Sequence, residues 1–456
     1  MGLTLDLAGT AVEIADDGAP PETLDRAKLA IRDVLGVALY GSQHPVGEHI
    51  SAFVDAAEPG TAATLLGGGT ASTTGAALAN GTFGHAIDYD DTFESIVLHP
   101  TAPVFAAALA TAERVLADGE RLLGSYVAGV EVAYRIAHSV YPGHYDNGWH
   151  LTGTVGTFGA TAAAGTLVEL SPEALARAFG IAGSCSSSLK KNFGTTTKPL
   201  HAGHAAEMGI RAALLADEGF GATGEVLEGP MGYGTVMNPT GTFDADDLRE
   251  SPEGHWGVED IGLKPYPSGV ITHAAMEATR RLVAEHDLDP SNVDRIEVTL
   301  DEAASEMLIH ADPADELEAK FSIEFCLAAV LRESDAGVAE FADEYVTDPA
   351  TREAMALVER AFEPGPFGEA FAGYGARVTV ETTGGEEHVA EERRAPGSPS
   401  NPLTEERWLS KFHECATPVL DREAAERVAS LTGELERLDD LGPLLAALGG
   451  PGDDRG

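Results

Sequence analysis

The change in hydrophobic periodicity along the chain is the feature that most constrains its fold. Between residues 22 and 250, apolar residues recur at the three- and four-residue spacing of amphipathic helices. Many of these segments are rich in alanine and glycine, which suits close contact between helices. Helices are predicted at about 22–40, 71–86, 103–118, 120–139, 153–169, 172–183 and 200–218. This part of the chain is therefore predicted to be mainly α-helical.

After about residue 260 the pattern changes. Ile296, Val298 and Leu300 alternate with polar residues, which is typical of a strand, and residues 376–390 form a predicted hairpin with Gly384 and Gly385 in its turn. Helices are expected among these strands at about 270–287, 321–332 and 349–361. A linker is predicted at 395–402, and helices return from 404 to about 448. The alternation of the two patterns indicates a small α+β domain.

The charge balance excludes some partners. The chain has 74 acidic and 29 basic residues, a net charge of -45, and the acids are spread along its length. Such a charge repels itself unless salt screens it, so we predict a halophilic protein whose melting temperature rises from dilute buffer to molar KCl. Nucleic-acid binding needs basic patches and is not expected. The start resembles no signal peptide and no apolar run is long enough for a membrane span, so a cytoplasmic location without membrane partners is expected.

The sequence predicts neither a metal nor a cofactor. Cys185, Cys326 and Cys415 are far apart and form no CxxC pair, so disulfides and cysteine-ligated clusters are not expected. His201 and His204 have the i, i+3 spacing of a metal-binding pair, but no third ligand is evident near them.

Lysine is scarce, so the seven lysines are informative. Lys198 follows Thr197 in "NFGTTTKPLHAGHAAEMG", where hydroxyls, backbone N–H groups and one cation meet at a helix start that favours an anion. Lys264 is held between prolines in "GLKPYPSG". These two lysines are candidates for binding an anionic substrate. Lys28 and Lys411, on predicted amphipathic helices, are interpreted as ordinary solvated lysines, and the adjacent Lys190 and Lys191 as a solvated pair.

Histidine is the natural acid or base near neutral pH. His99 and His150 each lie in a predicted loop at a helix start, where functional residues often occur. Most other histidines are interpreted as structural. The stretch "GHAIDYDDTFESIVLHP" (84–100) leaves two interpretations open. Its acids and Thr92 either cap a helix end, or Asp88 orients a catalytic histidine or lysine while Thr92 binds substrate.

Six stretches together resemble the MmgE/PrpD family, which includes 2-methylcitrate dehydratase, cis-aconitate decarboxylase and iminodisuccinate epimerase. They occur in family order and span nearly the whole chain. The stretches are "GHAIDYDDTF....LHPTAPV", "GWHLTGTVGTFGA", "NFGTTTKPLHAGHAAEMG", "GLKPYPSGVITHAA", "AKFSIEFCLAAVL" and "GSPSNPLTEERWLSKF".

The resemblance implies a fold and a site. The fold would be mainly α with a second α+β domain: a large all-helical domain built from residues 1–260 and 400–456, and a lid domain over 261–399, assembled as a homodimer. The site would lie in the cleft between the domains. Its residues in the decarboxylase branch match Asp88, Thr92, His99, His150, Lys198 and Lys264. A further histidine of that branch is replaced here by Gly269, and His273 follows four residues later.

These residues predict a cofactor-independent lyase that acts on a small di- or tricarboxylate. Lys198 and Lys264 would bind carboxylates, with Thr197 and His273 as further binding candidates. His99 and His150 would move protons, Asp88 would orient one of them, and Thr92 would donate a hydrogen bond to the substrate. Two alternatives stay open: an isomerase of the iminodisuccinate-epimerase type, and a non-catalytic carboxylate-binding dimer.

Overall fold

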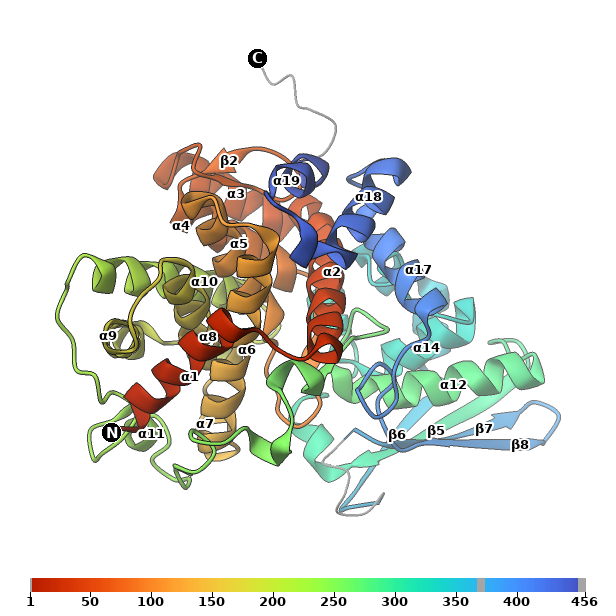
Figure 1. Ribbon diagram of the computed structural model, residues 1–456. Helices are drawn as coiled ribbons and strands as arrows, with labels where there is room; N and C mark the ends of the chain where they lie inside the picture. The colour runs from red at the N-terminus through yellow and green to blue at the C-terminus, as the bar shows by residue number, and fades with distance from the viewer. Residues whose placement is uncertain (1, 367–373, 450–456) are drawn as a thin grey trace. The chain divides into compact units, whose positions relative to one another are not determined.

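The chain divides into two compact units (Figure 1). The computed structural model describes residues 2–366 and 374–449. One unit comprises Met1–Gly262 and Cys415–Gly456, and the other comprises Leu263–Glu414. The sequence interpretation grouped residues 400–414 with the terminal helices, whereas by their contacts these residues group with the second unit. Among the described residues, every helix is too short or too polar to cross a lipid bilayer.

The first unit is built mainly of helices, as the periodicity predicts. Its helices are α1 Leu3–Asp17, α2 Pro21–Gln43, α3 Pro45–Ala57, α4 Thr73–His85, α5 Thr101–Val115, α6 Gly119–Val140, α7 Gly143–Asp146, α8 Leu151–Leu167, α9 Pro172–Cys185, α10 Thr197–Asp217, α11 Tyr233–Val236, α18 Arg422–Gly433 and α19 Gly442–Leu448. Two short strand pairs accompany them: β1 Ala63–Thr64 with β2 Thr70–Ala71, and β3 Thr92–Phe93 with β4 Ile261–Gly262. Short 3-10 helices lie at Lys190–Asn192, Pro252–Gly254, Gly257–Asp260 and Leu435–Arg437. The seven predicted helices are confirmed to within a few residues.

Small residues let the central helices of this unit approach closely. Helix α10 packs against α4 and α8, and α8 packs against α5 and α6 (Figure 1). A Cβ atom on Gly203 of α10 would lie 2.1 Å from the carbonyl oxygen of Leu78 in α4, which is far inside van der Waals contact. A Cβ atom on Gly159 of α8 would lie 2.8 Å from the carbonyl oxygen of Gly129 in α6. This packing sets the end of α4 beside the start of α10.

The second unit contains a four-stranded sheet and its covering helices. Its strands are β5 Val293–Asp301, β6 Val358–Glu363, β7 Ala376–Thr382 and β8 Glu387–Glu392, in the order β6-β5-β7-β8. Its helices are α12 His273–His286, α13 Glu316–Ala319, α14 Ile323–Glu333, α15 Asp343–Val346 and α16 Pro349–Met355, with 3-10 helices at Val270–Thr272 and Glu302–Glu306. Helix α17, Glu405–Ala416, contains the boundary between the units.

The predicted strand and hairpin of this unit are confirmed. The alternating residues Ile296, Val298 and Leu300 of β5 are fully buried and pack in a core with α12 and α14. Strands β7 and β8 pair antiparallel, and Gly385 in their turn has φ 81°, a left-handed conformation that favours glycine.

The predicted helix over 349–361 is wrong in its second half. Helix α16 ends at Met355, and residues 358–363 form β6, which pairs parallel with β5 from Ile296↔Val358 onward. A parallel partner comes from a distant part of the chain, so its hydrogen bonds have no counterpart in the local pattern. Tertiary pairing therefore overrides the weak helical periodicity of this segment.

Candidate active site

The site begins where helix α4 ends. The last helical residue is His85, and Asp88, three residues later, has φ 56°, a left-handed conformation. The chain turns there and carries Asp88, Asp90 and Asp91 into the interior, where all three carboxyl groups are buried. Buried carboxylates need partners, because an unpaired charge away from water is costly. The partners of each aspartate show which of the two interpretations of this stretch applies to it.

Asp91 has a structural role. It accepts hydrogen bonds from the backbone N–H of Thr101, at 3.2 Å, and from the Thr101 hydroxyl. Thr101 is the first residue of α5 and also contacts the hydroxyl of Tyr126 at 2.7 Å. Burial raises the pKa of Asp91 well above its usual value, and the hydrogen bonds from Thr101 oppose that rise. Asp91 therefore anchors the start of α5, the following helix, and does not cap the end of α4.

Asp88 meets the sequence-selected lysine and one histidine. The Lys198 Nζ atom at the start of α10 lies 2.7 Å from Asp88 Oδ2. The other carboxylate oxygen, Oδ1, lies 3.7 Å from His99 Nε2. Lys198 and Asp88 are both buried, so each supplies the opposite charge that a buried ionic group needs. His99, Asp88 and Lys198 thus form one cluster.

His85 and Asp90 also belong to this cluster, although the sequence interpretation did not select them. His85 Nδ1 lies 2.9 Å from Asp90 Oδ2, and His99 Nδ1 lies 3.4 Å from Asp90 Oδ1. Burial lowers the pKa of His85 to about 4, so this ring is neutral near pH 7 and its Nδ1–H donates to Asp90. Burial alone would raise the pKa of Asp90, but His85 and His99 hold it below its usual range. Both residues lie within the 84–100 stretch, so their closeness to Asp88 in the sequence could have identified them as site candidates.

His150 approaches the same cluster from the start of α8. Its ring stacks at 5.8 Å from the His85 ring, and the Phe193 ring meets its edge at 4.9 Å. Its Nδ1 lies 3.0 Å from the Nδ1 of His201, one turn along α10 from Lys198. Burial, followed by the positive charge of neighbours such as Lys198, lowers the pKa of His150 well below its usual value. The His150 ring is therefore neutral at neutral pH.

The remaining candidates of the first unit, Thr92 and Thr197, and the pair His201 and His204, have other contacts. Thr92 is buried, and its hydroxyl donates to the carbonyl of Leu98 at 3.2 Å, next to His99. Thr197 is half-buried at the first residue of α10, and its backbone N–H donates to the Thr195 hydroxyl. His201 lies against His150, whereas its spacing partner His204 is partly exposed beside Glu207.

Lys264 and His273 belong to the second unit, where they approach a common acceptor. The Lys264 Nζ atom donates to the carbonyl oxygen of Ser268 at 3.1 Å, and His273 Nε2 lies 3.2 Å from the same oxygen. Both side chains are buried. Gly269, which stands where the decarboxylase branch has a histidine, follows Ser268 directly, and a Cβ atom there would lie 3.3 Å from the Phe321 ring.

Four residues of the first unit have the donor set of a metal site. Ligand atoms of His85, Asp88, Asp90 and His99 lie within 4.8 Å of one another. A cation there would compete with the ammonium of Lys198, which already lies 2.7 Å from Asp88 Oδ2. Two like charges at this spacing repel strongly in a buried environment. The contacts observed are those of an ion-pair network built around Lys198.

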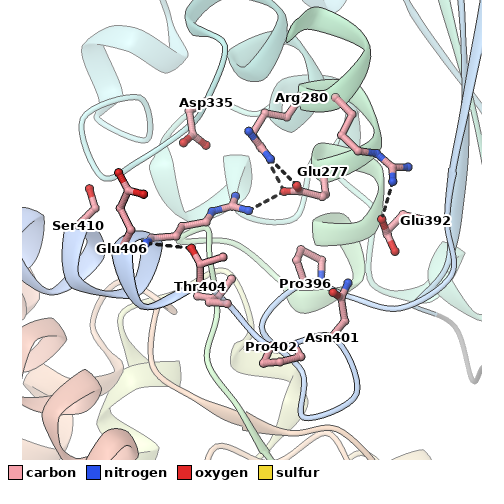
Figure 2. A pocket seen from close by; sticks show the side chains of 13 residues that line it. Glu277, Arg280, Asp335, Glu392, Pro396, Asn401, Pro402, Thr404, Glu406 and Ser410 are labelled. Atoms are coloured by element: carbon pink, nitrogen blue, oxygen red, sulfur yellow. Dashed lines mark hydrogen bonds and ion pairs between the residues drawn. The ribbon is translucent and has the colours of Figure 1, made fainter. Parts of the chain in front are cut away.

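A cavity of about 600 Å³ in the second unit has a different character (Figure 2). Arg280 and Arg407 both point at Glu277, at 2.6 and 2.7 Å, and Arg281 pairs with Glu392 at 3.4 Å. Arginine does not exchange its proton near neutral pH. The described residues that line the cavity include no histidine and no lysine. The described lining of this cavity therefore lacks the lysine and the histidines that the cluster around Asp88 brings together.

Comparison with known proteins assigns both parts of the chain. The family model of the MmgE/PrpD N-terminal domain matches residues 5–246, and that of the MmgE/PrpD C-terminal domain matches residues 266–437. A cis-aconitate decarboxylase of Aspergillus terreus is 26% identical in an alignment covering 99% of this chain and 96% of that protein. The human cis-aconitate decarboxylase is 28% identical over 94% of this chain and 90% of its own. The mouse enzyme is 27% identical, with 93% and 89% covered.

Proposed function

The chain belongs to the MmgE/PrpD family, and on that premise we propose that it is a cofactor-independent lyase that acts on a small di- or tricarboxylate. The relatives named cis-aconitate decarboxylase make cis-aconitate the first substrate to test. The observation that carries the proposal is the buried contact between Lys198 and Asp88, with His99 beside the same carboxylate and His150 stacked on His85. The cluster supplies a fixed positive charge and two proton carriers, which are the groups this reaction class needs.

Lys198 would hold one substrate carboxylate. In a chain with a net charge of -45, an anionic substrate needs a local cation, and few are available. Asp88 fixes the position of the ammonium by one short contact, at 2.7 Å. Thr92 lies at the edge of the cluster, where its hydroxyl could turn from the Leu98 carbonyl to the substrate. Lys264 stays the second proposed carboxylate ligand, as the resemblance to the family implies.

The chemical step would break a bond at the carbon alpha to a carboxylate. When a proton or CO2 leaves this carbon, the bonding electron pair stays behind and spreads into the adjacent carboxylate as an enediolate. A preorganised ammonium stabilises this developing charge more strongly than water does, because it needs no reorganisation during the reaction. Lys198 therefore contributes to binding and to the transition state alike.

The two histidines would take different roles. His150 is the proposed proton acceptor, because it lies beside the cluster against the His85 ring and is neutral at neutral pH, where burial and neighbouring positive charges disfavour its charged form. His99 lies between Asp88 and Asp90, at 3.7 and 3.4 Å, which positions it to deliver a proton to the carbanion or to a leaving hydroxyl. In a decarboxylase only the delivery is needed, whereas a dehydratase needs both steps.

The neutral His150 also favours a second candidate function. An epimerase of an imino diacid removes a proton from one face of the carbon and returns one to the other, which requires two proton carriers. His150 and His99 could serve this purpose. The carboxylate site would be the same, so the two functions differ in what happens after proton removal.

A substrate panel tests the proposal. The protein in molar KCl is incubated with 2-methylcitrate, citrate, cis-aconitate and iminodisuccinate, and products are followed by NMR. We expect CO2 release or alkene formation from at least one tricarboxylate. Binding of these compounds without turnover of any would contradict the enzyme and support a carboxylate-binding protein.

Solvent deuterium separates the lyase from the epimerase. An epimerase incorporates deuterium at the alpha carbon of recovered substrate and product in both directions. A dehydratase forms alkene and labels its substrate only as fast as it reverses, and a decarboxylase labels the product at the carbon that lost CO2. Exchange at the alpha carbon without alkene or CO2 would replace the lyase by the epimerase.

A further inference from the structure

A short loop joins two of the candidate site residues. Residues 93–98 connect Thr92 to His99, and the loop closes on itself where the Phe93 N–H donates to the Leu98 carbonyl at 3.0 Å. The same carbonyl accepts the Thr92 hydroxyl at 3.2 Å. The conformation of this loop therefore determines where the Thr92 hydroxyl and the His99 ring lie.

Asp260 holds this loop from outside the cluster. Its Oδ2 atom accepts from the Ser95 N–H at 3.1 Å and from the Ser95 hydroxyl at 2.6 Å. Its backbone carbonyl accepts from the Glu94 N–H at 2.8 Å. The next two residues of the chain, Ile261 and Gly262, pair with Phe93 and Thr92 as strand β4. Asp260 is buried, so these hydrogen bonds form away from competing water.

Two histidines complete this second group. His138 Nε2 lies 3.1 Å from the Ser95 hydroxyl, and His255 Nε2 lies 3.9 Å from Asp260 Oδ1. A serine hydroxyl has one proton, so Ser95 donates it to Asp260 and accepts a hydrogen bond from His138. Burial, and then His255, lower the pKa of His138 to about 4, which keeps this ring neutral. Ser95 is thus held from two sides.

We propose that Asp260 is a positioning residue: through Ser95 it fixes the 93–98 loop and so places Thr92 and His99 for the reaction. Asp260 binds the loop at Glu94 and Ser95, and its effect on Thr92 and His99 passes through the loop backbone. The activity part of this inference rests on the proposed function, whereas the placement of His99 does not.

Ser95→Ala is the primary test, because it removes the hydroxyl and keeps the Ser95 N–H bond to Asp260. Misplacing a catalytic group by about 1 Å can cost roughly 100-fold in rate, so we expect kcat to fall by about 10- to 100-fold. The loss should fall on kcat more than on KM, because Lys198 still binds the substrate carboxylate. Ser95→Thr keeps the hydroxyl and should restore most of the turnover. Asp260→Asn keeps the size of the side chain and should also lower kcat.

Glu113 offers a matched control. It is a carboxylate of the same unit that accepts the Thr64 N–H at 3.0 Å and the Thr64 hydroxyl at 2.8 Å, the same pair of contacts that Asp260 makes with Ser95. Thr64 lies in β1, which carries none of the candidate site residues. Glu113→Gln should leave kcat and KM unchanged even if it lowers the melting temperature as much as Asp260→Asn does.

A readout without substrate separates this inference from the proposed function. The imidazole NMR signal of His99 is assigned by its loss in His99→Gln and then compared in the other variants. We expect it to move in Ser95→Ala and Asp260→Asn and to stay in Glu113→Gln. A signal that stays in both loop variants, or one that moves while kcat is unchanged, would overturn the inference. If no compound of the panel is turned over, the proposed function fails, and the His99 signal still decides whether Asp260 positions the loop.

Discussion

Two groups of buried charge in this chain use the same elements in different ways. In the first unit, the carboxylate of Asp88 meets Lys198 and His99 at 2.7 and 3.7 Å. In the second unit, the carboxylate of Glu277 meets Arg280 and Arg407 at 2.6 and 2.7 Å and also accepts the Tyr266 hydroxyl at 3.0 Å. Both groups place a carboxylate against cations inside an acidic protein. The difference lies in whether the cations can give up a proton.

The Glu277 network consists of groups with fixed charges, whereas the Asp88 cluster contains groups that exchange protons. Burial alone would raise the pKa of Glu277, but hydrogen bonds from Arg280 and Arg407 lower it to about 2, so all three groups keep fixed charges. In the Asp88 cluster the neighbours are lysine and histidines, which exchange protons much more readily than arginine does. Fixed charges hold a structure together, whereas exchangeable ones can do chemistry. The comparison therefore predicts that substitutions in the two groups affect different properties.

His150→Ala should produce the largest effect on turnover. General acid–base groups contribute about 10²- to 10⁴-fold, so kcat should fall by that amount while KM changes little. Steady-state kinetics on the substrate found by the panel measures this. His286→Ala is the control, because His286 is a partly exposed histidine of the second unit that stacks on His388. Turnover near wild type in a folded His150→Ala protein would remove His150 from the site.

Lys198→Ala should have the next largest effect. A hydrogen bond to a charged group contributes about 1.5–3 kcal/mol, which corresponds to a loss of at least roughly 10-fold in kcat/KM. If Lys198 also stabilises the enediolate, kcat falls together with the rise in KM. Lys28→Ala is the control, because Lys28 also pairs with two carboxylates, those of Asp25 and Glu436. Equal kinetics in the two variants would show that Lys198 is only another paired lysine.

Glu277→Gln should change stability while turnover stays near wild type. The pKa of Glu277 falls from 4.5 to about 2 on folding, and one pKa unit is 1.36 kcal/mol, which gives at most about 3 kcal/mol of stabilisation. Because the folded pKa is lowered, this stabilisation is present above about pH 4.5 and is lost as the pH falls toward 2. The melting-temperature difference between wild type and variant should therefore shrink over that range. A difference that is independent of pH would assign the stabilisation to another cause.

Chelation should have no effect on turnover. The four donors around Asp88 resemble a metal site, but we expect Lys198 to serve as the cation there. Activity in molar KCl should survive prolonged EDTA treatment followed by dialysis, with metal content checked by mass spectrometry. Loss of activity that zinc, iron or magnesium alone restores would show that the cluster in the first unit holds a metal.

The sequence predicts the elements of this fold better than their contacts. The helices of the first unit follow from local periodicity, as does the buried alternation of β5. Strand β6 was predicted as part of a helix, because its parallel pairing with β5 joins residues about 60 positions apart and leaves no local signal. Local chemistry specifies an element, whereas its partner depends on the whole chain.

The candidate site shows the same division. Scarcity selected Lys198, and loop position selected His99 and His150, so single residues could be nominated from the sequence. The contact between Lys198 and Asp88 joins residues 110 positions apart, and only the packing of α4 against α10 creates it. His85 was not selected, although it lies in the 84–100 stretch that the sequence singles out. Its partner Asp90 becomes visible only when the turn after α4 is folded.

The left-handed backbone at Asp88 also limits how this position can change during evolution. Glycine, asparagine and aspartate accept φ 56° more readily than other residues, and of these only aspartate brings a carboxylate to Lys198. A single-base change in an aspartate codon can give asparagine or glycine, which suit the backbone and abolish the charge. Another gives glutamate, which keeps the charge on a longer side chain that suits the backbone less well. Because one residue meets a conformational and a chemical demand at once, each of these one-step replacements gives up one of the two.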